Sequence, residues 1–351
     1  MKRSADIAVT AVFLCFIVFF SLLGLFMPDI DFSPRENRYL QQIPDLSAKT
    51  LFSGDYTERF EKYTTDQFPF RDTWTTVKAR CELLSGKKEN NGVYYCGGGV
   101  LIRRYTAPSP EVIEENTGYL NQLAENVDVP VYFALIPGAS EVESDRMPRN
   151  APTDSQTAII RQAYALSGAE NVDMLTALDG HRDEYIFYRT DHHWTSLGAF
   201  YGYNALRSAW GLEKAPLTAY ERTTVTEDFY GTVYSSSGFS WVPPDSIERF
   251  VPDDGSAVIT NFNSATPETT PLYNVSALAL KDKYTYFLGG NTPRLSVETG
   301  AEDKPSLCVI RDSYTDSLLP FLLEDFSRID LLDLRYFKQS VSDYIRDGEF
   351  D

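Results

Sequence analysis

The fold of this chain is decided near its end by residues 307–323, which read LCVIRDSYTDSLLPFLL. Residues 307–310 are apolar and β-prone, and residues 317–323 have the composition of a buried helix. The turn between them, Arg311-Asp312-Ser313-Tyr314, carries a serine. A strand, a tight turn with serine and a helix expose the serine hydroxyl at the edge of an α/β sheet, beside the N–H groups of the helix N-terminus. The stretch therefore predicts an α/β fold with Ser313 as a candidate nucleophile.

This serine needs a base, because a hydroxyl is a weak nucleophile until a neighbouring group removes its proton. The chain holds three histidines, and two of them lie in Asp191-His192-His193-Trp194. Histidine exchanges protons near neutral pH, and a carboxylate two residues before it can orient the imidazole and stabilise its charged form. We therefore predict that His193 is the base for Ser313 and that Asp191 orients it.

The place of this tetrapeptide in the fold follows from the residues after it. Residues 197–210 have helical composition, and Ser196 is a candidate N-cap. Asp191 and His193 are therefore expected in a loop before a helix, and loops at strand ends are where α/β domains place their sites. Each motif alone is common, since Asp-Ser often caps a helix and Asp-x-His often marks a buried hydrogen bond. Their combination in one chain is more specific.

Bulk composition narrows the function. With 351 residues, 43% of them hydrophobic, the chain can bury the core of one large or two modest domains. Its net charge of −18 argues against a nucleic-acid partner, because phosphate binding needs a basic face, and it disfavours polyanionic substrates unless a local basic groove exists. Aromatic residues reach 14%, and surfaces rich in them hold sugars, although aromatics are more often core.

The cysteines and histidines predict neither a metal nor a cofactor. The four cysteines, Cys15, Cys81, Cys96 and Cys308, form no CxxC pair, and three histidines are too few for a zinc cluster. Cys15 and Cys308 lie in apolar runs and are expected to be packing residues. Cys81 and Cys96 can pair if the domain is extracytoplasmic.

The N-terminal residues 7–27, IAVTAVFLCFIVFFSLLGLFM, carry no charge over a length that crosses a bilayer as a helix. Two basic residues precede the run and two aspartates follow it closely. By the positive-inside rule, residues 1–6 are a cytoplasmic tail and the rest of the chain lies outside the cell membrane. The alternatives are a cleaved signal peptide and a buried helix of a soluble domain. We expect a single-pass anchor, because no small-x-small cleavage site closes the run.

The remaining chain divides by composition. Residues 28–90 are expected to form a stalk and juxtamembrane helices, in which Pro69 splits a helical stretch at 56–84. The expected result is a helix–helix corner with a buried aromatic pair, Phe68 and Phe70. Residues 91–351 are predicted as the catalytic domain. Residues 221–297 within it are rich in Thr, Tyr, Ser, Pro and Gly, which predicts a β-rich insert.

Periodicity and turn residues predict the elements of this domain. The expected strands are 93–95 and 100–102 as a hairpin, 131–136 and 171–174 as buried parallel strands, 256–259, 284–288 and 329–334. The expected helices are 111–127, 156–166, 197–210 and 341–346. An α/β core would normally continue beyond the last of these, so either the sheet ends there or the chain is truncated.

Asp191-His192-His193-Trp194 resembles the signature of the bacterial DHHW protein family, which is similar to the alginate O-acetyltransferase proteins of the cell envelope. Segments across nearly the whole chain agree with that family: the N-terminal anchor, Glu36-Asn37-Arg38, Asp66-Gln67-Phe68-Pro69-Phe70-Arg71, Asn91-Gly92-Val93-Tyr94, residues 131–137 and Asp312-Ser313-Tyr314. The resemblance implies an SGNH-hydrolase-like, three-layer domain with a circularly permuted motif order. It also implies that Asp191 and His193 supply acid and base and that Ser313 is the nucleophile.

The groups that would hold the oxyanion and the substrate are less defined. Where the family has glycine before Asp-Ser, this chain has Arg311, which narrows the freedom of the turn or places a cation near the substrate. Gly290-Asn291 is the candidate for the Gly and Asn that hold the oxyanion in SGNH enzymes, although Gly-Asn also simply makes turns. Trp194 and Tyr230 are candidates for contacts with a sugar or are ordinary packing residues. Tyr314 is a further substrate candidate.

Together these features predict an extracytoplasmic O-acyltransferase that acts on a cell-surface or exported polysaccharide through an acyl-serine. The resemblance implies an acetyl group, and it implies a multispanning membrane acyltransferase as partner and acyl donor. Two alternatives stay open at this point. One is a carbohydrate esterase or deacetylase with the same triad, in which water replaces the sugar hydroxyl. The other is a non-catalytic envelope scaffold or glycan-binding protein.

Overall fold

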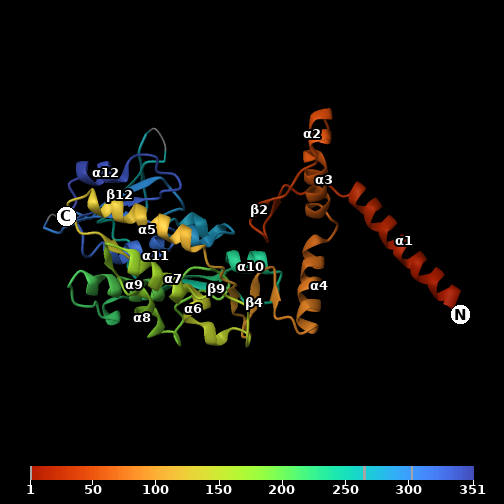
Figure 1. Cartoon of the computed structure of the whole chain (residues 1–351), viewed down its shortest axis with the longest axis horizontal. Coiled ribbons are helices and arrows are strands. Elements are labelled where there is room, and N and C mark those ends of the chain that lie inside the picture. Colours follow the sequence, from red (N-terminus) through yellow and green to blue (C-terminus); the bar gives the residue numbers. More distant parts are fainter. Residues whose placement is uncertain (1, 264–265, 302) are drawn as a thin grey trace. The chain divides into compact units, whose positions relative to one another are not determined.

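The structure is a computed structural model of the whole chain and describes residues 2–263, 266–301 and 303–351. Its backbone divides into two compact units. The first contains Met1–Asn91 and Ser235–Ser240, and the second contains Gly92–Tyr234 and Trp241–Asp351. Small parts of the predicted tail (1–6) and of the predicted insert (221–297) lie outside the described residues. Figure 1 shows the helices and strands in the order of the sequence.

The first unit begins with helix α1 (Lys2–Phe26). Its segment Ala5–Phe26 has a mean hydropathy of 2.7 and none of the helix window is buried, so α1 is long and apolar enough to cross a membrane. The prediction of an apolar N-terminal helix is confirmed. A cleavable signal sequence meets the same criteria. The orientation of α1 and its retention in the mature protein therefore stay predictions.

The prediction that Pro69 splits a long helix is confirmed. Helix α3 (Asp55–Asp66) ends before Pro69, and α4 (Arg71–Leu84) begins after it. The prediction of a buried aromatic pair is wrong, because Phe68 and Phe70 are 37% and 56% exposed. The two rings do not bury each other, since Phe68 instead stacks on Phe20 of α1 with ring centroids 5.4 Å apart.

Ion pairs account for two polar motifs of this unit. The buried Asp66 carboxylate accepts bonds of 2.9 and 2.6 Å from the two terminal nitrogens of Arg38. The hydrogen bonds from Arg38 lower the pKa of the Asp66 carboxyl to about 2. Glu36 pairs with Arg71 at 2.7 Å. These ion pairs therefore fix the chain that follows α1 to the corner between α3 and α4. They join Glu36-Asn37-Arg38 to the segment from Asp66 to Arg71. The other elements here are β1 (Phe32–Ser33), β2 (Arg38–Tyr39), α2 (Ala48–Ser53) and β3 (Glu89–Asn90).

The second unit is built on a five-stranded mixed sheet of order β11-β10-β12-β14-β13. The pair at one edge, β13 (Ser306–Ile310) and β14 (Arg328–Leu332), is parallel, and the other pairs are antiparallel. Both strands of this pair were expected from their apolar runs. The remaining strands are β10 (Val258–Asn261), β11 (Glu268–Thr270) and β12 (Arg294–Glu298). The mixed α/β class is therefore confirmed.

The predicted insert is corrected by this topology. From Val258 onward the segment 221–297 supplies strands of the main sheet, and β12 lies between β10 and β14. The expected strand at 284–288 is wrong. It contains a 3₁₀ turn, η4 (Lys283–Tyr286), which buries Tyr284 and Tyr286 on its inner side. Periodicity did not separate this short aromatic turn from a strand, because residues 284 and 286 are buried here and residues 283 and 285 are less so.

Most predicted helices of this unit are confirmed: α5 (Pro110–Glu125), α7 (Gln156–Leu166), α9 (Ser196–Ala209) and α12 (Val341–Asp347). The predicted cap of α9 is wrong by one residue. Thr195 is the N-cap and accepts from the N–H of Gly198, whereas the Ser196 hydroxyl donates to the Glu248 carbonyl. Helix α11 (Tyr314–Leu322) begins directly after Ser313 and continues through Pro320.

Small sheets complete the unit. The predicted hairpin is confirmed as β4 (Val93–Tyr95) with β5 (Leu101–Arg103). The strand at 131–136 shrinks to β6 (Tyr132–Phe133), which is half-buried and pairs in parallel with β7 (Glu170–Asn171). The strand at 171–174 ends at Asn171, because Asp173 caps helix α8 (Met174–Asp179). The others are α6 (Ala139–Val142), η1 (Ser144–Arg146), η2 (Leu217–Ala219), β8 (Thr223–Phe229), α10 (Thr232–Ser237), β9 (Asp245–Arg249) and η3 (Val275–Ala279).

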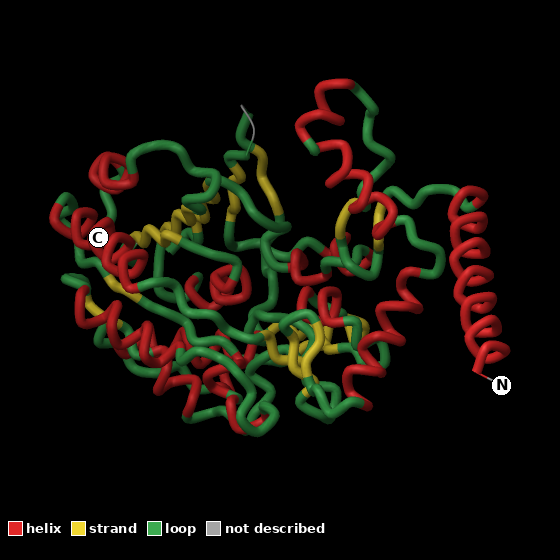
Figure 2. The backbone as a smooth tube through the Cα atoms, turned by 45° about the vertical axis from the view of Figure 1, so that its right-hand side comes forward, coloured by secondary structure: helices red, strands yellow, loops and turns green. Residues whose placement is uncertain are grey.

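Packing of α9 against α11 places the site. The ring of Phe321 in α11 lies 5.8 Å from Phe200 and 5.7 Å from Tyr203 of α9, and all three are buried. The labels of α9 and α11 lie close together in Figure 1, and Figure 2 shows the helices and strands of the backbone from a second direction. One helix begins after the His-His loop and the other after Ser313. Docking the two helices therefore brings two loops together that are far apart in sequence.

Candidate active site

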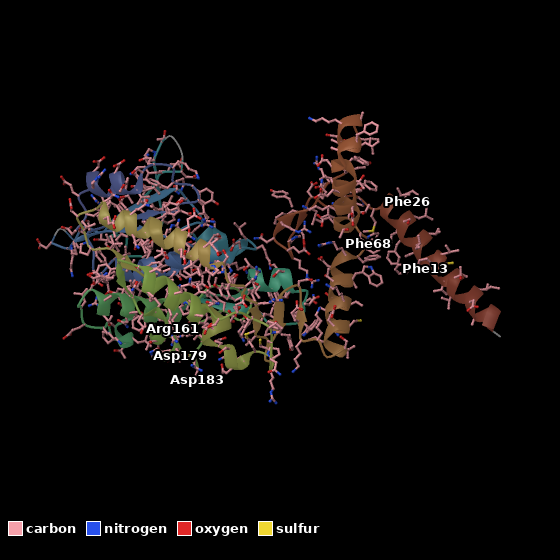
Figure 3. All side chains as sticks on the ribbon, viewed as in Figure 1. Phe13, Phe26, Phe68, Arg161, Asp179 and Asp183 are labelled. Carbon is pink, nitrogen blue, oxygen red and sulfur yellow. The ribbon has the colours of Figure 1, made fainter. Side chains whose placement is uncertain are left out.

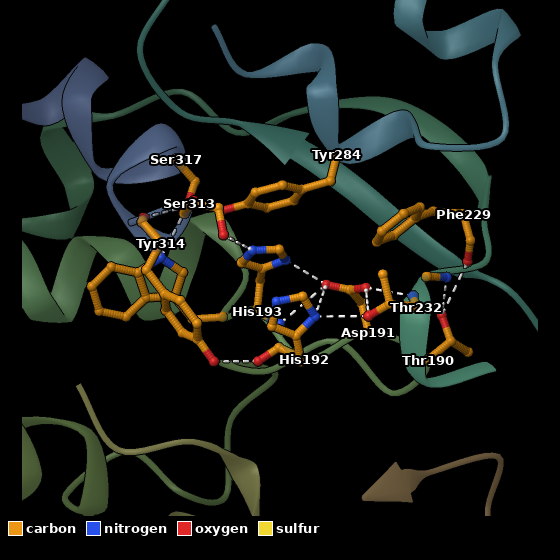
Figure 4. Close-up of polar contacts among 12 residues, drawn as sticks. Thr190, Asp191, His192, His193, Phe229, Thr232, Tyr284, Ser313, Tyr314 and Ser317 are labelled. Atoms are coloured by element: carbon orange, nitrogen blue, oxygen red, sulfur yellow. Dashed lines mark hydrogen bonds and ion pairs between the residues drawn. The ribbon is translucent and has the colours of Figure 1, made fainter. Parts of the chain in front are cut away.

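Ser313 and His193 are in hydrogen-bond contact (Figure 4). The serine Oγ lies 2.7 Å from the His193 Nε2. Ser313 is half-buried at the N-cap of α11, directly after the turn that follows β13, and His193 is 5% exposed. The His193 loop does not follow a sheet strand as expected. It is preceded by an isolated bridge between Phe187 and Trp194, so α9 rather than a strand end fixes its position.

Asp191 holds the other side of the imidazole. Its Oδ1 lies 2.5 Å from the His193 Nδ1 and also accepts from the His193 N–H at 3.1 Å. A carboxylate at Nδ1 keeps the proton there and leaves Nε2 free to accept from a hydroxyl. Asp191, His193 and Ser313 therefore form one continuous chain of hydrogen bonds.

The second oxygen of Asp191 is held by the residues that follow Tyr230, a segment whose sequence fits either a glycan contact or an ordinary loop. Thr232 donates to the Asp191 Oδ2 from its N–H at 2.7 Å and from its hydroxyl at 2.9 Å. Gly231 precedes it, and a Cβ there would lie 2.2 Å from the Asp191 Cβ. The dipeptide thus needs glycine for close approach and threonine for its two donors. In the sequence, Gly-Thr carries no signal that separates this role from an ordinary turn.

The environment sets the pKa values of the pair in defined directions. Burial would raise the pKa of the Asp191 carboxyl, but bonds from the two imidazoles outweigh it and hold the pKa well below the usual value. Burial lowers the pKa of the His193 imidazole, and Asp191 opposes that shift only in part. The resting state near neutral pH is therefore an ionised Asp191 and a neutral His193, which is the state in which Nε2 can accept a proton.

Tyr284 was missed by sequence reasoning and packs on His193, the candidate base. Its ring stacks face to face on His193, with centroids 3.8 Å apart and an interplanar angle of 6°. Its hydroxyl donates to the Ser313 carbonyl at 3.0 Å and lies 3.1 Å from the Ser317 Oγ. Burial raises the pKa of this phenol well above its usual value, so it stays a neutral donor. Tyr284 therefore touches both halves of the Ser–His pair.

Trp194 and Tyr314 join the two loops. Trp194 is fully buried, and its indole N–H donates to the Tyr314 carbonyl at 3.0 Å and to the Ser317 Oγ at 2.9 Å. The Tyr314 hydroxyl donates in return to the carbonyl of His192. Of the two interpretations of Trp194, the packing one fits, since a fully buried ring cannot stack on a sugar. His192 is exposed, and its Nδ1 lies 2.7 Å from the Thr232 Oγ1.

Three other candidates are engaged elsewhere. The Arg311 side chain is fully buried in an ion pair with Asp316, so it cannot present a cation to a substrate. The Asn291 Oδ1 accepts from Arg335 at 3.0 Å. Tyr230 packs on the ring of Tyr234, with centroids 4.5 Å apart. None of these side chains makes a hydrogen bond to the triad in the described part of the chain.

Asp191, His192 and His193 offer ligand atoms within 4.8 Å of one another, a spacing that could hold a metal ion. Four of those atoms already have partners, since Asp191 Oδ1 binds His193 Nδ1, His193 Nε2 binds Ser313 and His192 Nδ1 binds Thr232. A metal ion would have to displace these bonds. All four cysteines are free in the structure, so the possible pairing of Cys81 with Cys96 is not present there.

The family assignment follows from a model of the DHHW protein family, which matches residues 90–332. The chain belongs to the DHHW protein family. Among solved structures, a DHHW family protein from Eubacterium siraeum superposes with a TM-score of 0.65 and 26% identity, over 75% of this chain and 89% of that one. Bacillus cereus PatB1 shares the fold, with a TM-score of 0.61 and 20% identity over 74% of this chain and 92% of its own.

Curated relatives of this DHHW protein include the probable alginate O-acetylase AlgJ of Pseudomonas aeruginosa. It is 24% identical over 173 residues, which are 46% of this chain and 44% of AlgJ. The chain thus spans about half the length of the curated relatives it matches.

Proposed function

We propose that this protein transfers an acyl group, acetyl in the first instance, to a polysaccharide hydroxyl through an acyl-Ser313 intermediate. The observation that carries the proposal is the unbroken chain of hydrogen bonds from Asp191 through His193 to Ser313. A hydroxyl held 2.7 Å from a neutral, oriented imidazole is an activated nucleophile. Membership of the DHHW family and the name of the AlgJ relative favour O-acetyl transfer over other uses of such a triad.

The reaction runs in two balanced halves. The Ser313 oxygen attacks the acyl carbonyl while its proton moves to the His193 Nε2, and the imidazolium is stabilised by Asp191. Collapse of the tetrahedral intermediate forms acyl-Ser313 and expels the donor's leaving group, which takes the proton from Nε2. A sugar hydroxyl then attacks the acyl-serine and gives its proton to Nε2. Collapse releases the sugar ester, and the proton returns to Ser313.

The oxyanion donor that we propose is the Ser313 N–H, at the N-terminus of α11. The N–H of the next residue, Tyr314, is taken by the Asp312 carboxylate at 2.9 Å. Among the described residues, the Ser313 N–H has no acceptor. Together with the Asp–His–Ser order of the motifs, this turn supports the SGNH-like, permuted arrangement that the family resemblance implies. Arg311 is set aside as an oxyanion donor because its side chain is buried in the ion pair with Asp316. Asn291 stays a second candidate donor, since the bond from Arg335 occupies its acceptor Oδ1 and not its donor Nδ2.

The location that we propose is outside the cell membrane, with α1 (Lys2–Phe26) as a single-pass anchor and a cytoplasmic N-terminus. Its support is the apolar 22-residue span of α1 and the two basic residues before it. Acyl transfer outside the cell needs a donor, and a multispanning membrane acyltransferase that presents an acyl group to Ser313 is the partner we propose. The acceptor is a cell-surface or exported polysaccharide.

Serine-directed labelling tests the nucleophile. The full chain is treated with a fluorescent sulfonyl fluoride, beside Ser313→Ala and the control Ser342→Ala, whose serine lies in α12. The parent and Ser342→Ala proteins should be labelled, and Ser313→Ala should not. Equal labelling of all three proteins rules out Ser313 as the activated serine.

Product analysis separates transfer from hydrolysis. The protein is incubated with an activated acetyl ester, with and without soluble polysaccharides, and both free acetate and glycan-bound acetyl are measured. Transfer predicts acetyl on the glycan that depends on Ser313. If acetate is the sole product with every glycan, the protein is an esterase. If neither product depends on Ser313, it is a scaffold or glycan-binding protein.

A further inference from the structure

Helix α4 (Arg71–Leu84) carries an apolar stripe on the side opposite its buried residue Ala79. Trp74, Val77 and Leu84 are 38%, 41% and 88% exposed, and Cys81 is exposed as well. Their spacing is 3, 4 and 3 residues, which places them on one face of a helix. Counting about 100° per residue, the four lie within about 40° of the point opposite Ala79. Ala79 is fully buried, so the stripe faces outward.

The flanks of the stripe are basic. Lys78 and Arg80 lie about 80° to either side of its centre, by the same count of about 100° per residue. The acidic Asp72 lies near the Ala79 side of the helix, on the face away from the stripe. An apolar stripe between two cationic edges is the pattern of a helix that lies in a membrane interface. It is uncommon on a helix that faces water alone, where apolar residues occur singly.

The stripe is continuous with α1, the candidate membrane span. The Trp74 ring lies 5.6 Å from Phe20 and 6.0 Å from Phe16 of α1. Just before α4, Phe68 stacks on Phe20, and Pro69 lies 3.8 Å from the position of a Cβ on Gly24. Figure 3 shows Phe68 on the side of α4 that faces α1, with Phe26 at the near end of α1. A lipid that surrounds α1 would therefore also meet the start of the stripe.

The depth of these contacts fits an interfacial helix. Phe20 lies six residues before Phe26, the last residue of the span, which is about 9 Å along a helix at about 1.5 Å per residue. Interfacial helices bury their apolar face about 5–10 Å into the boundary between headgroups and acyl chains. Trp74, at the level of Phe20, then lies at the depth that aromatic residues favour.

We propose that α4 lies on the outer surface of the lipid bilayer that α1 crosses, with Trp74, Val77, Cys81 and Leu84 immersed in it. The occupant of this face is lipid rather than a protein, because the stripe continues the lipid-facing surface of α1 and its edges carry the positive charges that anionic headgroups attract. This inference does not depend on acyl transfer, since α4 and the triad lie in different units.

The native Cys81 reports on the proposal. In the full chain, Cys15, Cys96 and Cys308 are replaced by serine, which leaves a single thiol in the stripe. An environment-sensitive fluorophore is attached to it, and the protein is reconstituted in vesicles of phosphatidylethanolamine and phosphatidylglycerol. The matched control carries Cys81→Ser and Asp72→Cys, with the fluorophore on the opposite face of the same helix. Iodide quenches from water, and lipids spin-labelled near the headgroup quench from the bilayer.

The Cys81 fluorophore should lose most of its iodide quenching on transfer from detergent to vesicles and become quenched by the labelled lipid, whereas the Asp72→Cys fluorophore should keep its iodide quenching. A Leu84→Glu change should return the Cys81 fluorophore toward water, and Lys88→Glu, beyond the helix, should not. If both fluorophores stay equally open to iodide in pure lipid vesicles, the proposal is overturned. Protection that appears only in native membranes also overturns it, because the face then binds a protein.

Discussion

Replacing Gly231 by alanine is a direct test of how Asp191 is held. A Cβ at this position would lie 2.2 Å from the Asp191 Cβ, 2.5 Å from its Cγ and 2.3 Å from its Oδ2. Carbon atoms normally pack at about 3.5 Å or more, so the Asp191 loop must yield by about 1 Å. The backbone at Gly231 is not in the left-handed region, so alanine adds contact rather than backbone strain.

The size of the effect follows from the bonds that Asp191 makes. A displacement of about 1 Å takes Oδ1 from 2.5 Å to the limit of hydrogen bonding with the His193 Nδ1, and it moves Oδ2 off Thr232. A misplacement of about 1 Å in a catalytic group costs about 100-fold in rate. Overpacking of this kind costs about 1–3 kcal/mol of unfolding free energy. We expect kcat/KM to fall far more than this stability loss explains.

The assay is hydrolysis or transfer with a small acetyl ester, together with thermal unfolding of each variant. Gly118→Ala is the control, because a Cβ at Gly118 in α5 meets nothing within 4 Å. Asp191→Asn and the double variant Gly231→Ala/Asp191→Asn complete a cycle. The alanine should add little once Asp191 is already disabled, because both changes act through one carboxylate. Activity of Gly231→Ala within about twofold of the parent, or an equal loss in the Asp191→Asn background, would refute the reasoning.

Three further predictions concern charge. Because burial lowers the pKa of His193, the acidic limb of the kcat/KM–pH profile should lie below the unfolded pKa of about 6.5. The stability that the neutral imidazole contributes should be present above that pH and fade as pH falls. An acidic limb above neutral pH contradicts this prediction. Burial raises the pKa of Glu143 to about 7, so its stabilising contribution is present below its unfolded pKa and lost as pH rises through 7. Glu143→Gln should therefore raise the melting temperature at pH 8 and leave it unchanged at pH 5. Arg311→Met leaves the buried Asp316 without its ion-pair partner and should lower the free energy of unfolding in denaturant by about 3–5 kcal/mol. Adding Asp316→Leu in the same chain should recover most of this loss. Lost activity at unchanged stability would mean that Arg311 acts on the substrate.

Local chemistry could predict the three residues of the triad. The run at β13, the cap position of Ser313 and the carboxylate two residues before His193 are all short-range features. Each is fixed by the residues that lie next to it in sequence. Their proximity follows from the docking of α9 on α11, and the apolar composition of both helices indicates that they pack in the core.

The groups that support the triad could not be predicted in the same way. Thr232 and Tyr284 reach it from 41 and 91 residues beyond Asp191 and His193, through loops whose composition resembles many others. Arg311 was misjudged because its partner, Asp316, stands five residues away across a turn, a spacing that no helical pairing rule covers. The strands β10 and β11 were separated from the core for a related reason. Most residues of these two strands are polar, so the sequence does not indicate that Ile259 is buried on the face of the main sheet.

The signature Asp191-His192-His193-Trp194 makes physical sense once the contacts of His192 and Trp194 are included. In the proposed mechanism Asp191 and His193 move the proton, but among the described residues neither makes a hydrogen bond to helix α11. Trp194 does, by donating to the Tyr314 carbonyl, and the His192 carbonyl accepts from the Tyr314 hydroxyl in return. These two bonds join the loops with opposite donor directions, one from Trp194 to Tyr314 and one from Tyr314 to His192. A serine and a histidine separated by 120 residues can hold a 2.7 Å contact only if such ties fix both loops before a substrate arrives. In the proposed mechanism the signature therefore combines a proton relay with the hydrogen bonds that hold it beside the serine.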